Sequence, residues 1–155
     1  METIPEYLAL YKSDAVTDGN KYTWNINQSY YSNSRGSVCY VSLVQCLMSS
    51  PDNNEVIIKI HSGQNEITTD KQASVLGLMV MNESVAGGGH LSLNSSEPIR
   101  IKINSRPKTI TLQTNNLDNT AYNLGNNNAI FILKLEYLPL KEEQDNLIAQ
   151  EYPKL

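Results

Sequence analysis

The stretch from Asn128 to Leu138 constrains the fold of this chain more than any other segment, because its side chains alternate strictly between two kinds. One face carries Phe131, Leu133, Leu135 and Tyr137, and the other carries Ile130, Ile132, Lys134 and Glu136. This period of two is typical of a half-buried β-strand. It closes a run of short alternating segments that begins near Lys21, so the pattern predicts an all-β module.

Seven further segments, each bounded by Gly, Pro, Asn or Ser, have the pattern of strands. The first begins at Lys21, and the others span Ser37–Met48, Glu55–His61, Ser74–Met81, His90–Leu93, Ile99–Ile103 and Thr109–Thr114. With the last strand they predict eight short antiparallel strands. The long connections at 62–73 and 115–128 favour a two-sheet jelly-roll sandwich over a tight meander.

The segment Ser37–Met48 is apolar on both of its faces, which predicts a central position in a sheet. It contains both cysteines, Cys39 and Cys46, seven positions apart. A regular strand would place them on opposite faces and roughly 23 Å apart, so we expect no disulfide between them and a reducing or indifferent compartment.

The two ends of the chain lack the strand pattern. Residues 1–19 read as an N-terminal arm, in which Tyr7, Leu8 and Tyr11 have helical spacing. Residues 139–155 form an acidic C-terminal tail that could make a short helix with Leu147 and Ile148 on one side. The predicted organisation is therefore an arm, one domain over residues 20–138, and a tail.

Composition excludes some classes of function. A chain of 155 residues fits one domain, and a net charge of −4 with a pI near 5.1 argues against a dedicated nucleic-acid binder. No apolar run is long enough to span a membrane, and the segment Met1–Glu6 does not have the features of a signal peptide. We therefore expect a protein made in the cell interior and not secreted.

No catalytic constellation is evident in the sequence. His61 and His90, the two histidines, lie on separate segments without the ligand spacing of a metal site. Cys39 and Cys46 lie in an apolar strand, where a small buried side chain is the usual role. No pair of carboxylates is placed for acid and base chemistry. These features predict a non-enzyme with neither metal nor cofactor.

Aromatic residues suggest an alternative function. Trp24 shares a face with Tyr22 and Ile26 and is predicted to lie in the core, whereas Tyr30 and Tyr31 are candidate glycan contacts of a carbohydrate-binding, lectin-like jelly-roll module. A trimeric receptor ligand of the tumour necrosis factor type would share the layout, but it would need a secretory route.

Four stretches near the C-terminus resemble a known family. They are Ile99–Ile103, Pro107–Thr114, Asn119–Asn123 and Phe131–Tyr137. This order of an apolar strand pair, a polar hairpin and a last strand of apolar-Lys-apolar-Glu-aromatic form resembles the end of single jelly-roll minor capsid proteins of virophages, polinton-like viruses and related large DNA viruses. The resemblance spans residues 20–138 and is one of pattern and composition.

The resemblance implies a structural virion protein without catalytic residues. Such a penton-type subunit would assemble into a homo-oligomer, with a pentamer favoured, beside a larger major capsid protein in the virion. The two arms would tie subunits to their neighbours. The residues expected to anchor the arms at the oligomer interface are Tyr7, Leu8, Tyr11, Leu147, Ile148 and Tyr152.

Overall fold

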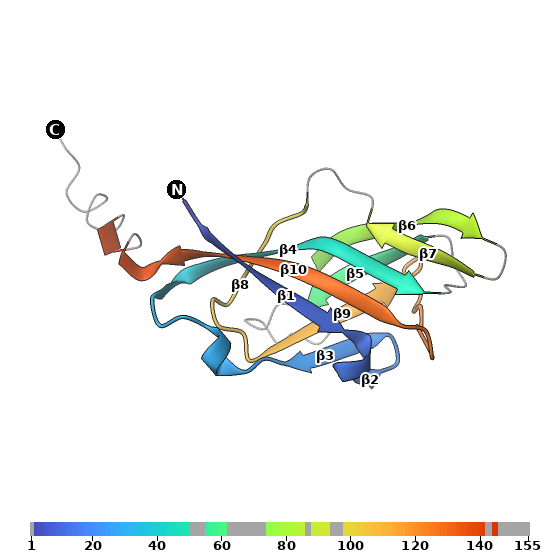
Figure 1. Ribbon diagram of the computed structural model, residues 1–155, viewed down its shortest axis with the longest axis horizontal. Helices are drawn as coiled ribbons and strands as arrows, with labels where there is room; N and C mark the ends of the chain where they lie inside the picture. Colours follow the sequence, from blue (N-terminus) through green and yellow to red (C-terminus); the bar gives the residue numbers. More distant parts are fainter. Residues whose placement is uncertain are drawn as a thin grey trace.

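The computed structural model describes residues 2–49, 55–61, 74–85, 88–93, 98–141 and 144–145, and these residues fold almost entirely as β-sheet (Figure 1). The strands are β1 (Ile4–Tyr11), β2 (Val16–Asp18), β3 (Lys21–Asn25), β4 (Arg35–Ser49), β5 (Glu55–His61), β6 (Ser74–Val85), β7 (Gly88–Leu93), β8 (Ile101–Ile103), β9 (Thr109–Asn115) and β10 (Ala129–Pro139). Two short 3-10 turns, η1 (Lys12–Asp14) and η2 (Gln28–Tyr30), flank the β2–β3 hairpin. The predicted all-β class is confirmed.

The strands pair in a nested order. β1 pairs with β10, β3 with β9, β4 with β8, and β5 with β6, all antiparallel. Further pairing of β10 with β4 and of β9 with β5 gives two four-stranded sheets, β1-β10-β4-β8 and β3-β9-β5-β6. β7 pairs with both β4 and β6 and so joins the two sheets. β2 extends the second sheet beside β3.

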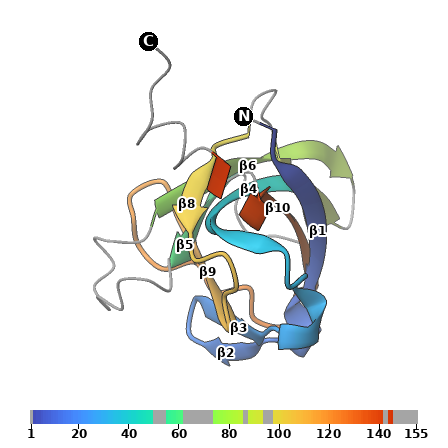
Figure 2. The ribbon, with the colours of Figure 1, turned by 90° about the vertical axis from the view of Figure 1, so that its left-hand side faces the viewer.

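One hydrophobic core lies between the two sheets. The predicted inner face of β10 is buried, since Phe131, Leu133 and Leu135 are fully covered. Trp24 of β3 is also buried, as predicted, and its ring meets that of Phe131 edge to face at 5.8 Å, which links the two sheets directly. In Figure 2 the strands enclose this core, with β5 and β9 lying opposite β1.

The prediction of an N-terminal arm is wrong for residues 4–11, which form β1 and pair with β10 along its length, from Ile4 opposite Tyr137 to Tyr11 opposite Ile130. It is also wrong for residues 16–18, which form β2 and pair with β3. Tyr7, Leu8 and Tyr11 are not on a helical turn. Leu8 and Leu10 point into the core, whereas Tyr7 and Tyr11 point outward. Pro5 is tolerated because its missing N–H lies on the free edge of β1. The folded domain therefore begins at residue 4.

A β-bulge changes the predicted faces of β4. Ile132 pairs with Gln45 and Leu133 with Leu43, so Val44 has no direct partner on β10. After this extra residue the alternation reverses, and Cys46 faces the core on the same side as Cys39. Both cysteines are buried and free. The expected central position of this strand is confirmed, because it lies between β10 and β7.

The backbone after β10 turns helical where it is described. Residues 140–141 and 144–145 have helical conformation, and the Leu140 N–H donates to the carbonyl of Ser34 at 2.7 Å. The remaining part of the predicted C-terminal tail lies outside the described residues.

Candidate functional site

The outer side of the β1-β10-β4 sheet carries an apolar surface. Register pairing aligns Tyr11, Ile130 and Leu47 in one cross-strand row, Ala9, Ile132 and Gln45 in the next, and Tyr7, Lys134 and Ser42 in the one after that. Paired residues of an antiparallel sheet project to the same face. Tyr11 and Leu47 are about half exposed, and Ile130 and Ile132 are partly covered. We call this surface, with Tyr7 at its edge, the outer face.

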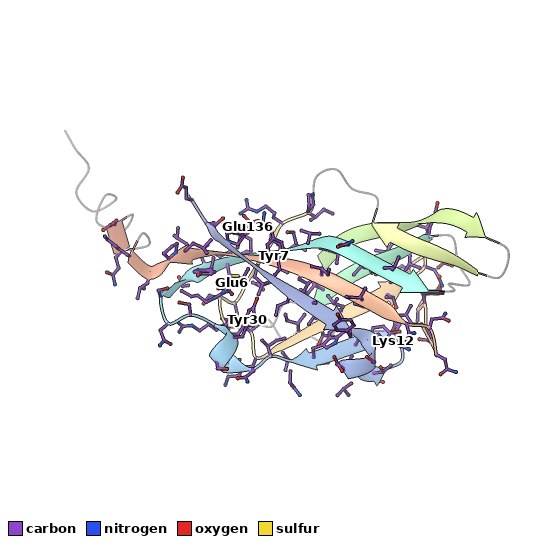
Figure 3. All side chains as sticks on the ribbon, viewed as in Figure 1. Glu6, Tyr7, Lys12, Tyr30 and Glu136 are labelled. Atoms are coloured by element: carbon purple, nitrogen blue, oxygen red, sulfur yellow. The ribbon has the colours of Figure 1, made fainter. Side chains whose placement is uncertain are left out.

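The outer face is flanked by charges at one end. Glu136 accepts from the Thr3 hydroxyl at 2.9 Å and pairs with Arg100 at 3.2 Å, and Arg100 stacks over the ring of Tyr40. Glu136 and Tyr7 project from neighbouring strands, as Figure 3 shows. A sheet face that exposes apolar side chains within a polar border is typical of a protein interaction surface.

The predicted interface residues are separated by the fold. Tyr7 and Tyr11 lie on the outer face and are 58% and 51% exposed, whereas Leu8 is buried in the chain's own core and cannot contact a neighbour there. Leu147, Ile148 and Tyr152 lie outside the described residues. The surface residues that were not predicted are Leu47, Ile130 and Ile132, although two isoleucines on the polar side of a half-buried strand were a usable signal.

A buried arginine cluster fixes β1 to the rest of the sheet. The Arg35 side chain is fully buried and forms an ion pair with Glu6 of β1 at 3.0 Å. Its Nε donates to the Ser105 carbonyl at 2.8 Å. Its guanidinium also lies over the rings of Tyr31 and Tyr137, at 4.8 and 4.2 Å. These contacts join β1, β4 and β10 with two loops, and they satisfy a charge that would otherwise be costly to bury.

The same environment keeps the Tyr31 phenol and the Cys39 thiol protonated. Burial raises the pKa of the Tyr31 phenol, and the charge of Arg35 opposes only part of this shift. Burial also raises the pKa of the Cys39 thiol, although Arg35 donates to its sulfur at 3.4 Å. A thiolate nucleophile is therefore disfavoured at Cys39 near neutral pH. The Arg35 cluster is a structural centre.

A groove of about 370 Å³ opens between β1 and the β2–β3 hairpin, at the edge where the two sheets diverge. Its apolar lining comes from Leu8, Ala9, Leu10, Val16, Trp24 and Ile26, and its polar lining from Asp14, Thr23, Asn25, Asn27 and Tyr30. We call it the edge groove. Because β1, β2 and β3 follow one another in the sequence, the chain between residues 8 and 30 supplies the whole lining.

The two candidate glycan contacts have different environments. Tyr31 is only 5% exposed, and its hydroxyl donates to the Pro107 carbonyl at 2.8 Å, so the prediction that it contacts a glycan is wrong. It packs under Arg35, which the sequence could not indicate. Tyr30 is 38% exposed and lines the edge groove, and its hydroxyl donates to the Tyr7 carbonyl at 2.9 Å (Figure 3).

Polar side chains on β5 and β9 form a third cluster. His61 Nε2 and Gln113 Oε1 are 2.7 Å apart, Gln113 donates to Asn115 at 2.8 Å, and Asn115 donates to the carbonyl of Asn119. Lys59 also donates to Asn119. This network holds the loop after β9 against the sheet. Among the described residues, no group of His, Cys, Asp and Glu side chains could hold a metal ion.

No protein-family model matches the chain, and no curated protein sequence matches it. In the described part of the chain there is no helix with the length and apolarity that a membrane crossing requires.

Proposed function

We propose that the chain is a structural virion protein, a minor capsid or penton-type subunit that assembles with copies of itself into a homo-oligomeric capsomer beside a major capsid protein. The observation that carries this proposal is the outer face. Tyr11, Leu47, Ile130 and Ile132 expose apolar surface on a sheet whose inner face already fills the core. Burying such a surface against a neighbouring subunit is favourable, at roughly 25 cal/mol per Å² of apolar area.

The nested strand order supports the jelly-roll fold that this role implies. The first strand pairs with the last, and successive pairs move inward along the chain and alternate between the two sheets. A jelly roll has this arrangement of eight strands in two sheets. Of the two remaining strands, β2 extends the edge beside β3, and β7 joins the two sheets between β4 and β6.

The subunit's work is assembly, for which geometry and buried area are sufficient, and we assign it no catalytic step. A contact of the outer face with the same face of a second copy would close as a dimer, because such an interface has twofold symmetry. A ring of five requires the outer face to meet a different surface of the next subunit. We favour the ring, in line with the family that the sequence resembles.

The solution mass of the full chain, measured by light scattering, tests the proposal. We expect a defined oligomer, and we expect Tyr11→Lys and Leu47→Lys to shift it to monomer, because each places a charge in the apolar rows. Leu117→Lys is the matched control, since Leu117 is 58% exposed and lies outside the outer face. A monomeric full chain would contradict self-assembly, and a dimer would contradict the ring.

A further inference from the structure

The edge groove is closed at its two ends by one side chain from β3 and one from η2, each of which donates a hydrogen bond to β1. The Tyr30 hydroxyl donates to the Tyr7 carbonyl at 2.9 Å, and the Trp24 indole N–H donates to the Tyr11 carbonyl at 2.8 Å. These carbonyls are four residues apart, which is roughly 13 Å along a strand. The backbone groups of Ala9 face the same way, since alternate residues of a strand share an edge.

This closure decides the kind of ligand that the edge groove can accept. Adding a peptide strand requires a row of free backbone groups along the edge, and here the carbonyls on both sides of Ala9 are already occupied. The stretch of β1 between the two occupied carbonyls is long enough for a small molecule. A volume of about 370 Å³ lies near the lower end of the range for small-molecule pockets, roughly 300–1,000 Å³.

The charge of the lining residues further narrows the class of ligand. Asp14 is the one formally charged side chain among the lining residues, and neither Lys nor Arg contributes to the lining. Phosphate, sulfate and carboxylate groups would meet a negative charge and no cation, so anionic ligands are disfavoured. An uncharged ligand rich in hydroxyl groups has no such penalty.

The rim presents both donors and acceptors. In the described part of the chain, the Asp14 carboxylate and the Asn25 amide form no hydrogen bond with another residue, and both are exposed. Asn27 Oδ1 accepts from the Ser29 N–H and hydroxyl, which fixes the amide and leaves its NH₂ group as a donor. A sugar hydroxyl donates and accepts, so it can pair with carboxylate and amide groups together.

The floor supplies the complementary apolar surface. The apolar lining residues with exposed surface are Ala9, Val16 and Ile26, since Leu8 and Leu10 are buried, and the partly exposed ring of Tyr30 also lines the edge groove. A sugar ring combines an apolar C–H face with polar hydroxyls at its edge, and an aromatic or aliphatic surface suits the C–H face. We propose that the edge groove binds a neutral saccharide. The site is built within one subunit, so it does not depend on the proposed function.

The test is an NMR titration of the full chain with a panel of neutral mono- and oligosaccharides. We expect at least one member to shift the side-chain amide signals of Asn25 and Asn27. Asn25→Ala should weaken its binding by about tenfold, the usual value of a lost hydrogen bond. Asn33→Ala is the matched control, because Asn33 is an exposed asparagine outside the lining, and it should leave binding unchanged.

A second variant blocks the edge groove without touching the bonds that close it. Val16 is 68% exposed and lies on the lining, so Val16→Trp should fill the space and abolish binding while the amide spectrum of the core stays the same. Three results would overturn the proposal: no neutral saccharide shifts the groove signals, anionic glycans bind in preference to neutral ones, or binding persists in Val16→Trp.

Discussion

At the scale of single residues, Arg35 joins several separate segments of the chain through one side chain. Its ion pair with Glu6 links β1 to β4, and the Arg35 side chain has no exposed surface. Removing one partner of such a pair leaves the other charge unpaired, which typically costs about 3–5 kcal/mol of stability. Because Glu6 is 23% exposed and can recruit water, we expect Arg35→Met to lower the free energy of unfolding by about 3 kcal/mol.

Urea unfolding of the variants in a double-mutant cycle tests this prediction. Glu6→Gln in the Arg35→Met background removes the unpaired charge and should restore part of the lost stability. A loss of less than about 1 kcal/mol in Arg35→Met would show that the cluster is no stronger than a surface ion pair.

Alkaline pH should destabilise the fold through the buried thiols and phenols. Burial raises the pKa of Cys46 and of Tyr31 in the folded chain above their unfolded values of about 8.5 and 10. A group with a raised folded pKa stabilises the fold fully below its unfolded pKa, and this contribution falls as pH rises toward the folded pKa. The free energy of unfolding should therefore decrease from about pH 8.5 upward.

The slope of the unfolding free energy against pH identifies the titrating group. Each proton released on unfolding contributes about 1.4 kcal/mol per pH unit, so Cys46→Ala should reduce the slope between about pH 9 and 10 by up to that amount. Urea unfolding at a series of pH values gives both slopes. Equal slopes in the two proteins would show that Cys46 is not the titrating group.

At the scale of elements, β1 provides the sharpest contrast between neighbouring positions. Leu10 is 4% exposed and Tyr11 is 51% exposed. If β1 belongs to the folded domain, Leu10→Ala should cost about 2–5 kcal/mol of unfolding free energy. Tyr11→Ala should cost less than about 1 kcal/mol, since it removes exposed surface. Thermal and urea unfolding compare the pair, and a free arm would instead give two small and equal effects.

The elements also show what the sequence could predict. The eight alternating segments coincide with β3 to β10, because strict alternation and turn residues are local signals. β1 escaped because Tyr7 and Tyr11 on its outer side resemble Leu8 and Leu10 on its inner side, so polarity does not alternate. The bulge at Val44 depends on register with β10, which one strand's sequence does not contain.

The sites were less predictable for the same physical reason. Glu6, Ser105 and Tyr137 meet at Arg35 from distant parts of the chain, and no local pattern marks them as partners. The edge groove is assembled from residues 8–30, so its aromatic and amide residues were visible in the sequence. The closure that makes it a groove was not, because it requires the side chains of Trp24 and Tyr30 to reach β1.

At the scale of the whole molecule, the nested pairing makes folding a problem of closing long loops. Ile4 pairs with Tyr137, so β1 and β10 can meet only by closing a loop that contains most of the chain. Loop-closure cost rises with the logarithm of loop length. All-β folds with such distant contacts usually fold in milliseconds to seconds.

A circular permutant isolates this cost. The start of β1 and the end of β10 lie at the same end of the sheet (Figure 1), so a short linker can join Pro139 to Ile4, with new termini opened at the exposed Asn126. β10 and β1 then become a local hairpin.

Shortening their loop to about ten residues lowers the closure cost by about 2 kcal/mol. Stopped-flow refolding should therefore be up to about 30-fold faster than in the parent chain. If the parent and the permutant refold at the same rate while both keep Trp24 buried by fluorescence, pairing of β1 with β10 follows the rate-limiting step, and the nucleus must form without that strand pair.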